Sequence, residues 1–259
     1  MNLLFVGDVI GRSGRRILSD QLGRLVDEHM VDLVVVNGEN AAGGFGLTLD
    51  VAREMFDLGV DVITSGNHIW DKREIYTHLD GDRPILRPAN YPPGLPGRGS
   101  GVFSTAGGVK VGVLNLEGRV FMDNLDCPFR AADALVEELS AETPIIFVDF
   151  HAEATSEKAA LASYLDGRVS AFAGTHTHVQ TADERILPEG TGYITDAGLT
   201  GSLDSVIGIR KELAIERFLT QLPVRFEVAK KRPVLCGVLF SIDEQSGRTE
   251  RVLRIQREI

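Results

Sequence analysis

The stretch Val169-Ser170-Ala171-Phe172-Ala173-Gly174-Thr175-His176-Thr177-His178 joins an apolar run of the β type to two histidines. Residues 169–174 have the length and composition of a buried strand, and His176 and His178 follow just past its end. Because side chains alternate along an extended segment, we expect both imidazoles on the same side of the chain. Such a segment can reach one or two neighbouring metal ions, so the stretch predicts a strand with metal ligands at its carboxyl end.

Four other apolar runs of the β type also end in polar residues that can bind metal ions. In chain order, those polar residues are Asp8, the block Asn37-Gly38-Glu39-Asn40, the pair Asn67-His68, and His151. In α/β sheets, ligands bind at the carboxyl ends of the strands. Five strand ends that carry carboxylates, amides and imidazoles therefore predict one metal-dependent site.

Helical patterns alternate with these runs through the first two thirds of the chain. Apolar residues recur at helical spacing over residues 17–26, a second helix is expected over about 48–58, and another follows Ser156. Asp71 and Glu74 have the spacing of a capping box that would open a short helix. This alternation of strands and helices predicts an α/β protein with a mainly parallel sheet.

The middle and the end of the chain have a different pattern. A loop rich in Pro and Gly is expected over residues 88–101, followed by hairpin strands at 101–104 and 109–116. The C-terminal part predicts a helix at about 210–222 and antiparallel strands at 225–228, 234–242 and 250–255. Two sheets packed face to face with helices outside would accommodate these elements. Since no repeat, linker or charge block marks a boundary, we expect one domain over residues 1–259.

Net charge restricts the classes of partner. The chain carries a formal net charge of −10, and its longest basic run is Lys230-Lys231-Arg232. Binding to long nucleic acids needs clustered Lys and Arg, so we do not expect such a partner. A small phosphorylated substrate is compatible with this charge if bound cations reverse the local field.

The remaining composition predicts a cytoplasmic protein. We find no apolar stretch near the roughly 18 residues of a membrane span, and no signal peptide before the first strand. Cys127 and Cys236 are expected to be reduced thiols. A homo-oligomeric assembly is left open.

Each candidate residue also has a simpler interpretation. Asp8 could cap the helix that follows it, Glu39 could be a solvated loop carboxylate, and Asn67 could only shape a turn. His68 could be a ligand, a general acid or a core histidine. A dinucleotide-binding loop is disfavoured, because Val9 stands where that motif needs its second glycine. The agreement of five strand ends favours the metal site.

The polar blocks resemble, in identity and in order, those of the calcineurin-like metallophosphoesterases. That superfamily has an N-terminal Asp, a G-D-type block, G-N-H, a lone His and G-H-x-H. The matching blocks here begin at Asp8 and end at His178. Ile10 stands where the superfamily has a His, and Glu39 where it has a bridging Asp. These departures, with the segments 87–92 and 195–201, are similar to the bacterial YmdB-like branch, which is associated with hydrolysis of cyclic nucleotides such as 2′,3′-cyclic AMP.

The resemblance implies a four-layer αββα sandwich of two mixed β-sheets and a site for two divalent or trivalent transition-metal ions. One ion would take Asp8, Glu39, His178 and Asn40 as ligands. The other would share Glu39 and take Asn67, His151 and His176. Nitrogen and oxygen ligands without thiolate suit Fe or Mn, and less decisively Zn.

Two metal ions can clamp a phosphoryl group and activate water, and the leaving alkoxide then needs a proton. His68, beside a ligand but not required as one, is the expected general acid. The expected substrate is a small phosphodiester, best represented by a cyclic nucleotide. Two alternatives are a regulatory metal-binding protein with little catalysis and an amidohydrolase on a TIM barrel. The second is disfavoured because its His-x-His normally follows the first strand.

Overall fold

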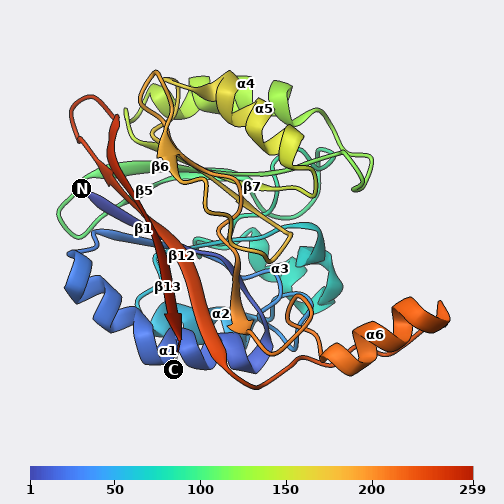
Figure 1. Cartoon of the computed structure of the whole chain (residues 1–259). Helices are drawn as coiled ribbons and strands as arrows, with labels where there is room; N and C mark the ends of the chain where they lie inside the picture. The colour runs from blue at the N-terminus through green and yellow to red at the C-terminus, as the bar shows by residue number, and fades with distance from the viewer. Residues whose placement is uncertain (259) are drawn as a thin grey trace.

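The computed structural model describes residues 1–258 and shows two β-sheets packed face to face, with helices over their outer sides (Figure 1). In spatial order the first sheet consists of β2 (Asp8–Val9), β11 (Leu199–Ser202), β12 (Pro233–Ile242), β1 (Asn2–Val6), β3 (Leu33–Asn37) and β4 (Val62–Thr64), with β13 (Thr249–Glu258) paired to β12. The second consists of β5 (Ser100–Ser104), β6 (Lys110–Glu117), β7 (Ile146–His151), β8 (Ala171–Thr175), β10 (Gly192–Ile194) and β9 (Arg185–Ile186). The predicted four-layer sandwich is confirmed, and the barrel of an amidohydrolase is excluded.

The helices lie between strands in sequence and outside the sheets in space (Figure 1). They are α1 (Gly11–His29), α2 (Leu49–Asp57), α3 (Tyr76–Leu79), α4 (Pro128–Ser140), α5 (Thr155–Leu165) and α6 (Lys211–Thr220), with the 3-10 turns η1 (Asn67–Asp71) and η2 (Arg73–Ile75) before α3. Helix α6 projects from the body of the molecule. No helix within residues 1–258 has the length and apolar character needed to cross a membrane.

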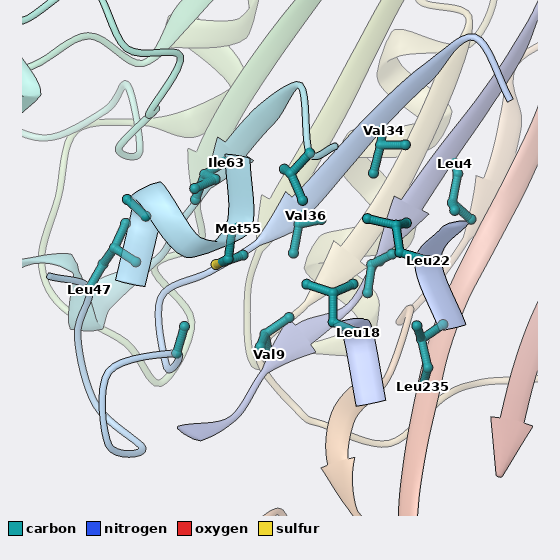
Figure 2. Packing of buried hydrophobic residues seen from close by; sticks show 14 of the residues in the cluster. Leu4, Val9, Leu18, Leu22, Val34, Val36, Leu47, Met55, Ile63 and Leu235 are labelled. Atoms are coloured by element: carbon teal, nitrogen blue, oxygen red, sulfur yellow. The ribbon is translucent and has the colours of Figure 1, made fainter. Parts of the chain in front are cut away.

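Apolar side chains form clusters at the interfaces between layers. Alternation along β1 sends Leu4 to the outer face, where it packs with Leu22 of α1 (Figure 2). Its neighbour Phe5 points between the sheets and lies 4.9 Å from Phe147 of β7, centroid to centroid. A further cluster joins the second sheet to α4 and α5 and includes the fully buried Leu161. These clusters hold the two sheets in a fixed relation, and the site depends on that relation.

Each sheet contains three adjacent parallel strands, and their carboxyl ends lie at the same edge of the sheet. Strands β1, β3 and β4 run parallel in the first sheet, as do β6, β7 and β8 in the second. Asn37 pairs with Thr64 at the ends of β3 and β4, and His151 pairs with Thr175 at the ends of β7 and β8. The predicted grouping of strand ends therefore follows from the topology.

Two local predictions outside the His-x-His segment are wrong. Residues 225–228 lie outside the strands of the described chain, and Val228 makes only an isolated bridge to Ile209. The capping box is also absent from the described residues, because Lys72 stands at the N-terminal cap of η2 and its side chain makes no cap hydrogen bond. Asp71 instead ends η1 and pairs with His68. Helix α4 was not among the predicted elements.

Candidate metal centre

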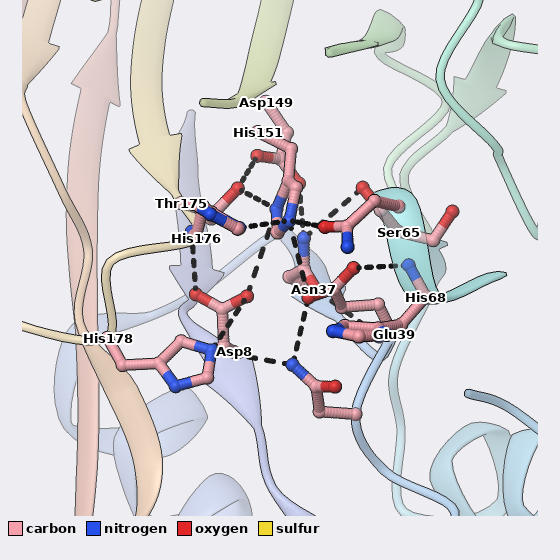
Figure 3. Close-up of polar contacts among 12 residues, drawn as sticks. Asp8, Asn37, Glu39, Ser65, His68, Asp149, His151, Thr175, His176 and His178 are labelled. Carbon is pink, nitrogen blue, oxygen red and sulfur yellow. Dashed lines mark hydrogen bonds and ion pairs between the residues drawn. The ribbon is translucent and has the colours of Figure 1, made fainter. Parts of the chain in front are cut away.

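The predicted ligands converge where the strand ends of both sheets meet (Figure 3). Ligand atoms of Asp8, Glu39 and His178 all lie within 4.8 Å of one another. Asn67, His151 and His176 form a second group beside them, joined by short contacts between side-chain atoms. The structure thus brings together residues as far apart in the sequence as Asp8 and His178.

Asp8 is fully buried and begins β2, two residues after the end of β1. Its Oδ2 accepts a hydrogen bond from the backbone N–H of His176 at 3.3 Å. Its Oδ1 lies 3.9 Å from both His151 Nδ1 and His178 Nε2, and among the described residues it has no hydrogen-bond partner. Burial raises the pKa of Asp8. A buried carboxylate oxygen without a partner is costly in a protein unless it meets a proton or a cation.

Glu39 uses its two carboxylate oxygens in different directions. Oε1 lies 3.3 Å from His151 Nε2 and accepts a hydrogen bond from Asn40 Nδ2 at 2.8 Å. Oε2 accepts the backbone N–H of His68 at 3.2 Å. Burial alone would raise the pKa of Glu39, but the neighbouring His151 imidazole outweighs it and lowers the pKa to about 2. The group is therefore a carboxylate that faces both parts of the site.

His151 is oriented by partners that the sequence pattern does not reveal. Its Nδ1 lies 2.9 Å from the hydroxyl oxygen of Thr175, and that hydroxyl lies 2.8 Å from a carboxylate oxygen of Asp149. Its Nε2 faces Asn67 Oδ1 and His176 Nδ1, each at 3.0 Å. A hydrogen-bond partner on the ring nitrogen that does not bind the metal, here Thr175 on Nδ1, fixes the ring orientation of a metal-binding histidine.

His176 and His178 each direct a ring nitrogen toward the other candidate ligands. Burial and the nearby His151 lower the pKa of His176 to about 3, so its ring is neutral. His178 Nδ1 lies 2.9 Å from the carbonyl oxygen of Ile207, which can only accept, so Nδ1 is a donor. His178 Nε2 is then the ring nitrogen that faces Asp8 Oδ1, at 3.9 Å. Neutral imidazoles are the form that binds metal ions.

The His-x-His segment is a strained turn and not the extended segment that was predicted. His176 and His178 have φ values of 97° and 64°. Asp196 holds the turn: one carboxylate oxygen accepts the Thr177 hydroxyl at 2.8 Å and its backbone N–H at 3.2 Å. The same oxygen pairs with Lys158 Nζ at 2.7 Å, and both side chains are buried. Strain of this kind persists when surrounding contacts determine the conformation.

Removing the charge of Lys158 is expected to destabilise the protein. In Lys158→Met the Asp196 carboxylate would stay buried without its cation, which typically costs roughly 3–5 kcal/mol. Urea unfolding of the two proteins measures this loss. The matched control is Lys110→Met, whose pair with Glu142 is solvent-exposed and is worth at most about 1 kcal/mol. Equal losses in the two variants would contradict a supporting role for the buried pair.

His68 lies at the rim of the site and lines a cavity of about 340 Å³ together with Glu39, His176 and His178. Its Nδ1 pairs with the Asp71 carboxylate at 2.9 Å, which leaves Nε2 as the nitrogen able to exchange a proton with a bound molecule.

Glu117 is a buried carboxyl near the site that the sequence analysis missed. It ends β6 and pairs in register with His151 of β7. Its two side-chain oxygens have no hydrogen-bond partner among the described residues, and burial raises its pKa to about 7. Glu117 directly follows the predicted strand 109–116, so the strand-end rule that selected the other candidates could have found it.

The donor set fits a metal ion. Among the buried side-chain oxygens that lack a hydrogen-bond partner within the described chain, two belong to residues predicted as ligands, Asp8 Oδ1 and Asn40 Oδ1. Carboxylate, amide and imidazole groups without thiolate suit transition metals of intermediate hardness. This cluster is a candidate metal-binding site.

Two crystal structures have the same fold across the whole of this chain. A hypothetical protein from Thermus thermophilus superposes with a TM-score of 0.93 at 44% sequence identity, covering 100% of this chain and 99% of that one. A phosphatase from Mycoplasma pneumoniae superposes with a TM-score of 0.93 at 35% identity, covering 100% of this chain and 93% of that one. The fold and the gathered strand-end residues define a two-sheet α/β protein of the same class as that phosphatase.

The family follows from the sequence matches. The model of the YmdB-like protein family matches residues 4–255. A Bacillus subtilis (strain 168) protein named 2′,3′-cyclic-nucleotide 2′-phosphodiesterase is 49% identical over 255 residues, which cover 98% of this chain and 96% of that protein. The chain belongs to the YmdB-like family, as the order of its polar blocks predicted.

Proposed function

We propose that this chain is a metal-dependent phosphodiesterase that hydrolyses small cyclic phosphodiesters, with nucleoside 2′,3′-cyclic phosphates as its main substrate class. The Bacillus subtilis relative, similar over nearly the full length, bears the name of such an activity. The single observation that carries the proposal is the buried Asp8 Oδ1, which has no hydrogen-bond partner among the described residues and lies 3.9 Å from ring nitrogens of both His151 and His178. A cation there would satisfy it.

Two transition-metal ions, Fe or Mn before Zn, are the cofactors we propose. Asp8, Glu39, His178 and Asn40 would hold one ion. Glu39, Asn67, His151 and His176 would hold the other. Bound ions would supply charge stabilisation for the phosphate and lower the pKa of a water molecule toward about 7.

The chain's own residues supply the remaining chemistry. Hydrolysis forms one bond from a water oxygen to phosphorus and breaks one bond from phosphorus to a ribose oxygen. The released ribose oxygen needs a proton, and we assign its delivery to His68. Asp71, paired with Nδ1, would hold the ring so that Nε2 faces the substrate in the cavity. The buried Asp149–Thr175–His151 series would keep the His151 ring in place.

A substrate panel tests the reaction class. Protein loaded with Fe or Mn should hydrolyse 2′,3′-cyclic AMP to a single adenosine monophosphate isomer and act much more slowly on a phosphomonoester such as glycerol phosphate. Product separation by chromatography gives both rates. Hydrolysis of the monoester alone would contradict the proposed diesterase and leave a phosphatase.

A further inference from the structure

The cavity beside the site is lined by two chemically different sets of side chains. The site residues Glu39, His68, His176 and His178 form the first set, called here the polar wall. The second set, called the apolar wall, consists of Ile10, Phe45, Ile207, Ile209 and Phe226. A cyclic phosphate alone would need only the polar wall. The apolar wall is therefore available to contact another part of a bound molecule.

Phe226 and Ile207 are exposed although they are apolar. Phe226 is 39% exposed and Ile207 is 52% exposed. Ile207 also has a φ of 47°, an outlier for a β-branched residue, while its carbonyl oxygen is held by His178. The contact to His178 thus couples the apolar wall to the candidate metal centre. Strained backbone of this kind is concentrated at functional sites.

Phe45 reaches the same cavity from a turn that directly follows the predicted ligand Asn40. Gly44 and Gly46 on either side have φ values of 104° and 80°. A Cβ at Gly44 would press against Val228, and one at Gly46 against Lys72. Phe45 is thus an aromatic presented by a turn that needs glycine, and its ring meets the His68 ring edge-on at 5.1 Å.

We propose that this apolar wall, with Phe226 as its main platform, stacks on the nucleobase of a nucleoside cyclic phosphate. The inference rests on the proposed function and adds how the same site selects its substrate. The phosphate would lie at the polar wall and the base at the apolar wall, in a cavity whose volume is at the lower end of the usual range for ligand pockets, roughly 300–1,000 Å³. The five apolar side chains carry no hydrogen-bond donor or acceptor, so the wall selects a base without distinguishing among bases.

A base-free substrate isolates this contribution. Glycerol 1,2-cyclic phosphate has the same five-membered cyclic phosphodiester as 2′,3′-cyclic AMP but no base. Replacing an aromatic platform by alanine typically weakens base binding by roughly 5- to 150-fold. Phe226→Ala should therefore lower the ratio of kcat/KM for 2′,3′-cyclic AMP to that for the glycerol compound by a factor in this range, and chiefly through KM.

Two further comparisons complete the test. Phe218→Ala is the matched control, because Phe218 is a 75% exposed aromatic on α6 that does not line the cavity within the described chain. It should leave the ratio unchanged. Wild-type kcat/KM for 2′,3′-cyclic UMP should stay within about tenfold of the value for 2′,3′-cyclic AMP, since stacking tolerates every base.

The possible results distinguish failure of the base-stacking wall from failure of the proposed phosphodiesterase function. A ratio that Phe226→Ala leaves unchanged, in an enzyme that hydrolyses both cyclic phosphates, would overturn the stacking wall and leave the proposed function standing. An equal fall in Phe218→Ala would also overturn it. A wild-type protein that, loaded with metal, hydrolyses neither compound would overturn both.

Discussion

Glu39→Ala is expected to abolish turnover and to remove bound metal more completely than Asn40→Ala. The Glu39 carboxylate directs one oxygen to His151 and Asn40 and the other toward the backbone of His68, so it can serve two ions. Asn40 offers at most one neutral oxygen. Its loss should cost about 10–100-fold in affinity or activity, the usual value for a supporting partner, and the loss of Glu39 should exceed that by at least about tenfold.

Elemental analysis and kcat/KM, measured on both variants purified without chelator, give the comparison. Glu39→Gln serves as the matched control, because it keeps the size of the side chain and removes its charge. It should resemble Glu39→Ala in metal content. Equal losses in Glu39→Ala and Asn40→Ala would argue against a carboxylate shared by two ions.

His68→Ala is expected to keep the bound metal and to lose activity in a way that depends on the leaving group. On 2′,3′-cyclic AMP, whose alkoxide needs protonation, the rate should fall by roughly 10²–10⁴-fold, the usual contribution of positioned proton transfer. On a nitrophenyl phosphodiester, whose leaving group needs little protonation, the loss should be much smaller. Rates at matched metal occupancy on the two substrates measure the difference.

The control for this substitution is His78→Ala, a half-buried histidine in α3 that lies outside the site cavity as the described residues define it. It should leave both rates unchanged. Similar losses on the two substrates in His68→Ala would mean that His68 only orients Asn67 or the phosphate. Loss of metal would instead make His68 a ligand.

The candidate ligands could be predicted from the sequence because the physics that places them is local. A buried parallel strand is recognisable as an apolar run, and its carboxyl end must lie beside the ends of its neighbours. Asp8, Glu39 and His151 each follow or end such a run. The topology of each sheet groups the strand ends within that sheet, and the face-to-face packing of the two sheets brings His151 to Asp8 and Glu39.

The supporting residues could not be predicted in this way. Lys158 lies within an ordinary helical pattern, and only the packing of α5 against the second sheet brings it to Asp196. Asp149 occupies an inward position of β7 and meets Thr175 across the register of β7 with β8. Such contacts depend on tertiary packing, which local patterns do not contain.

The shape of the His-x-His turn was mispredicted for a related reason. Alternation of side chains holds only for extended backbone, whereas His176 and His178 both have positive φ. The turn is stabilised by contacts outside the segment, the hydrogen bonds from Thr177 to the buried Asp196.

Asp71 was likewise assigned to a helix cap, but its carboxylate pairs with the His68 imidazole at 2.9 Å.

The central claim is that the gathered strand-end residues bind metal ions and that these ions are required to hydrolyse a cyclic phosphodiester. Its most direct test is the rate of 2′,3′-cyclic AMP hydrolysis measured against bound metal per chain, for the wild type and for Asp8→Ala. We predict that the wild-type rate rises with Fe or Mn content up to two ions per chain, and that Asp8→Ala binds less metal and stays near background. Equal turnover by metal-free and metal-loaded protein, or a fully loaded wild type that does not hydrolyse the substrate, would contradict the account.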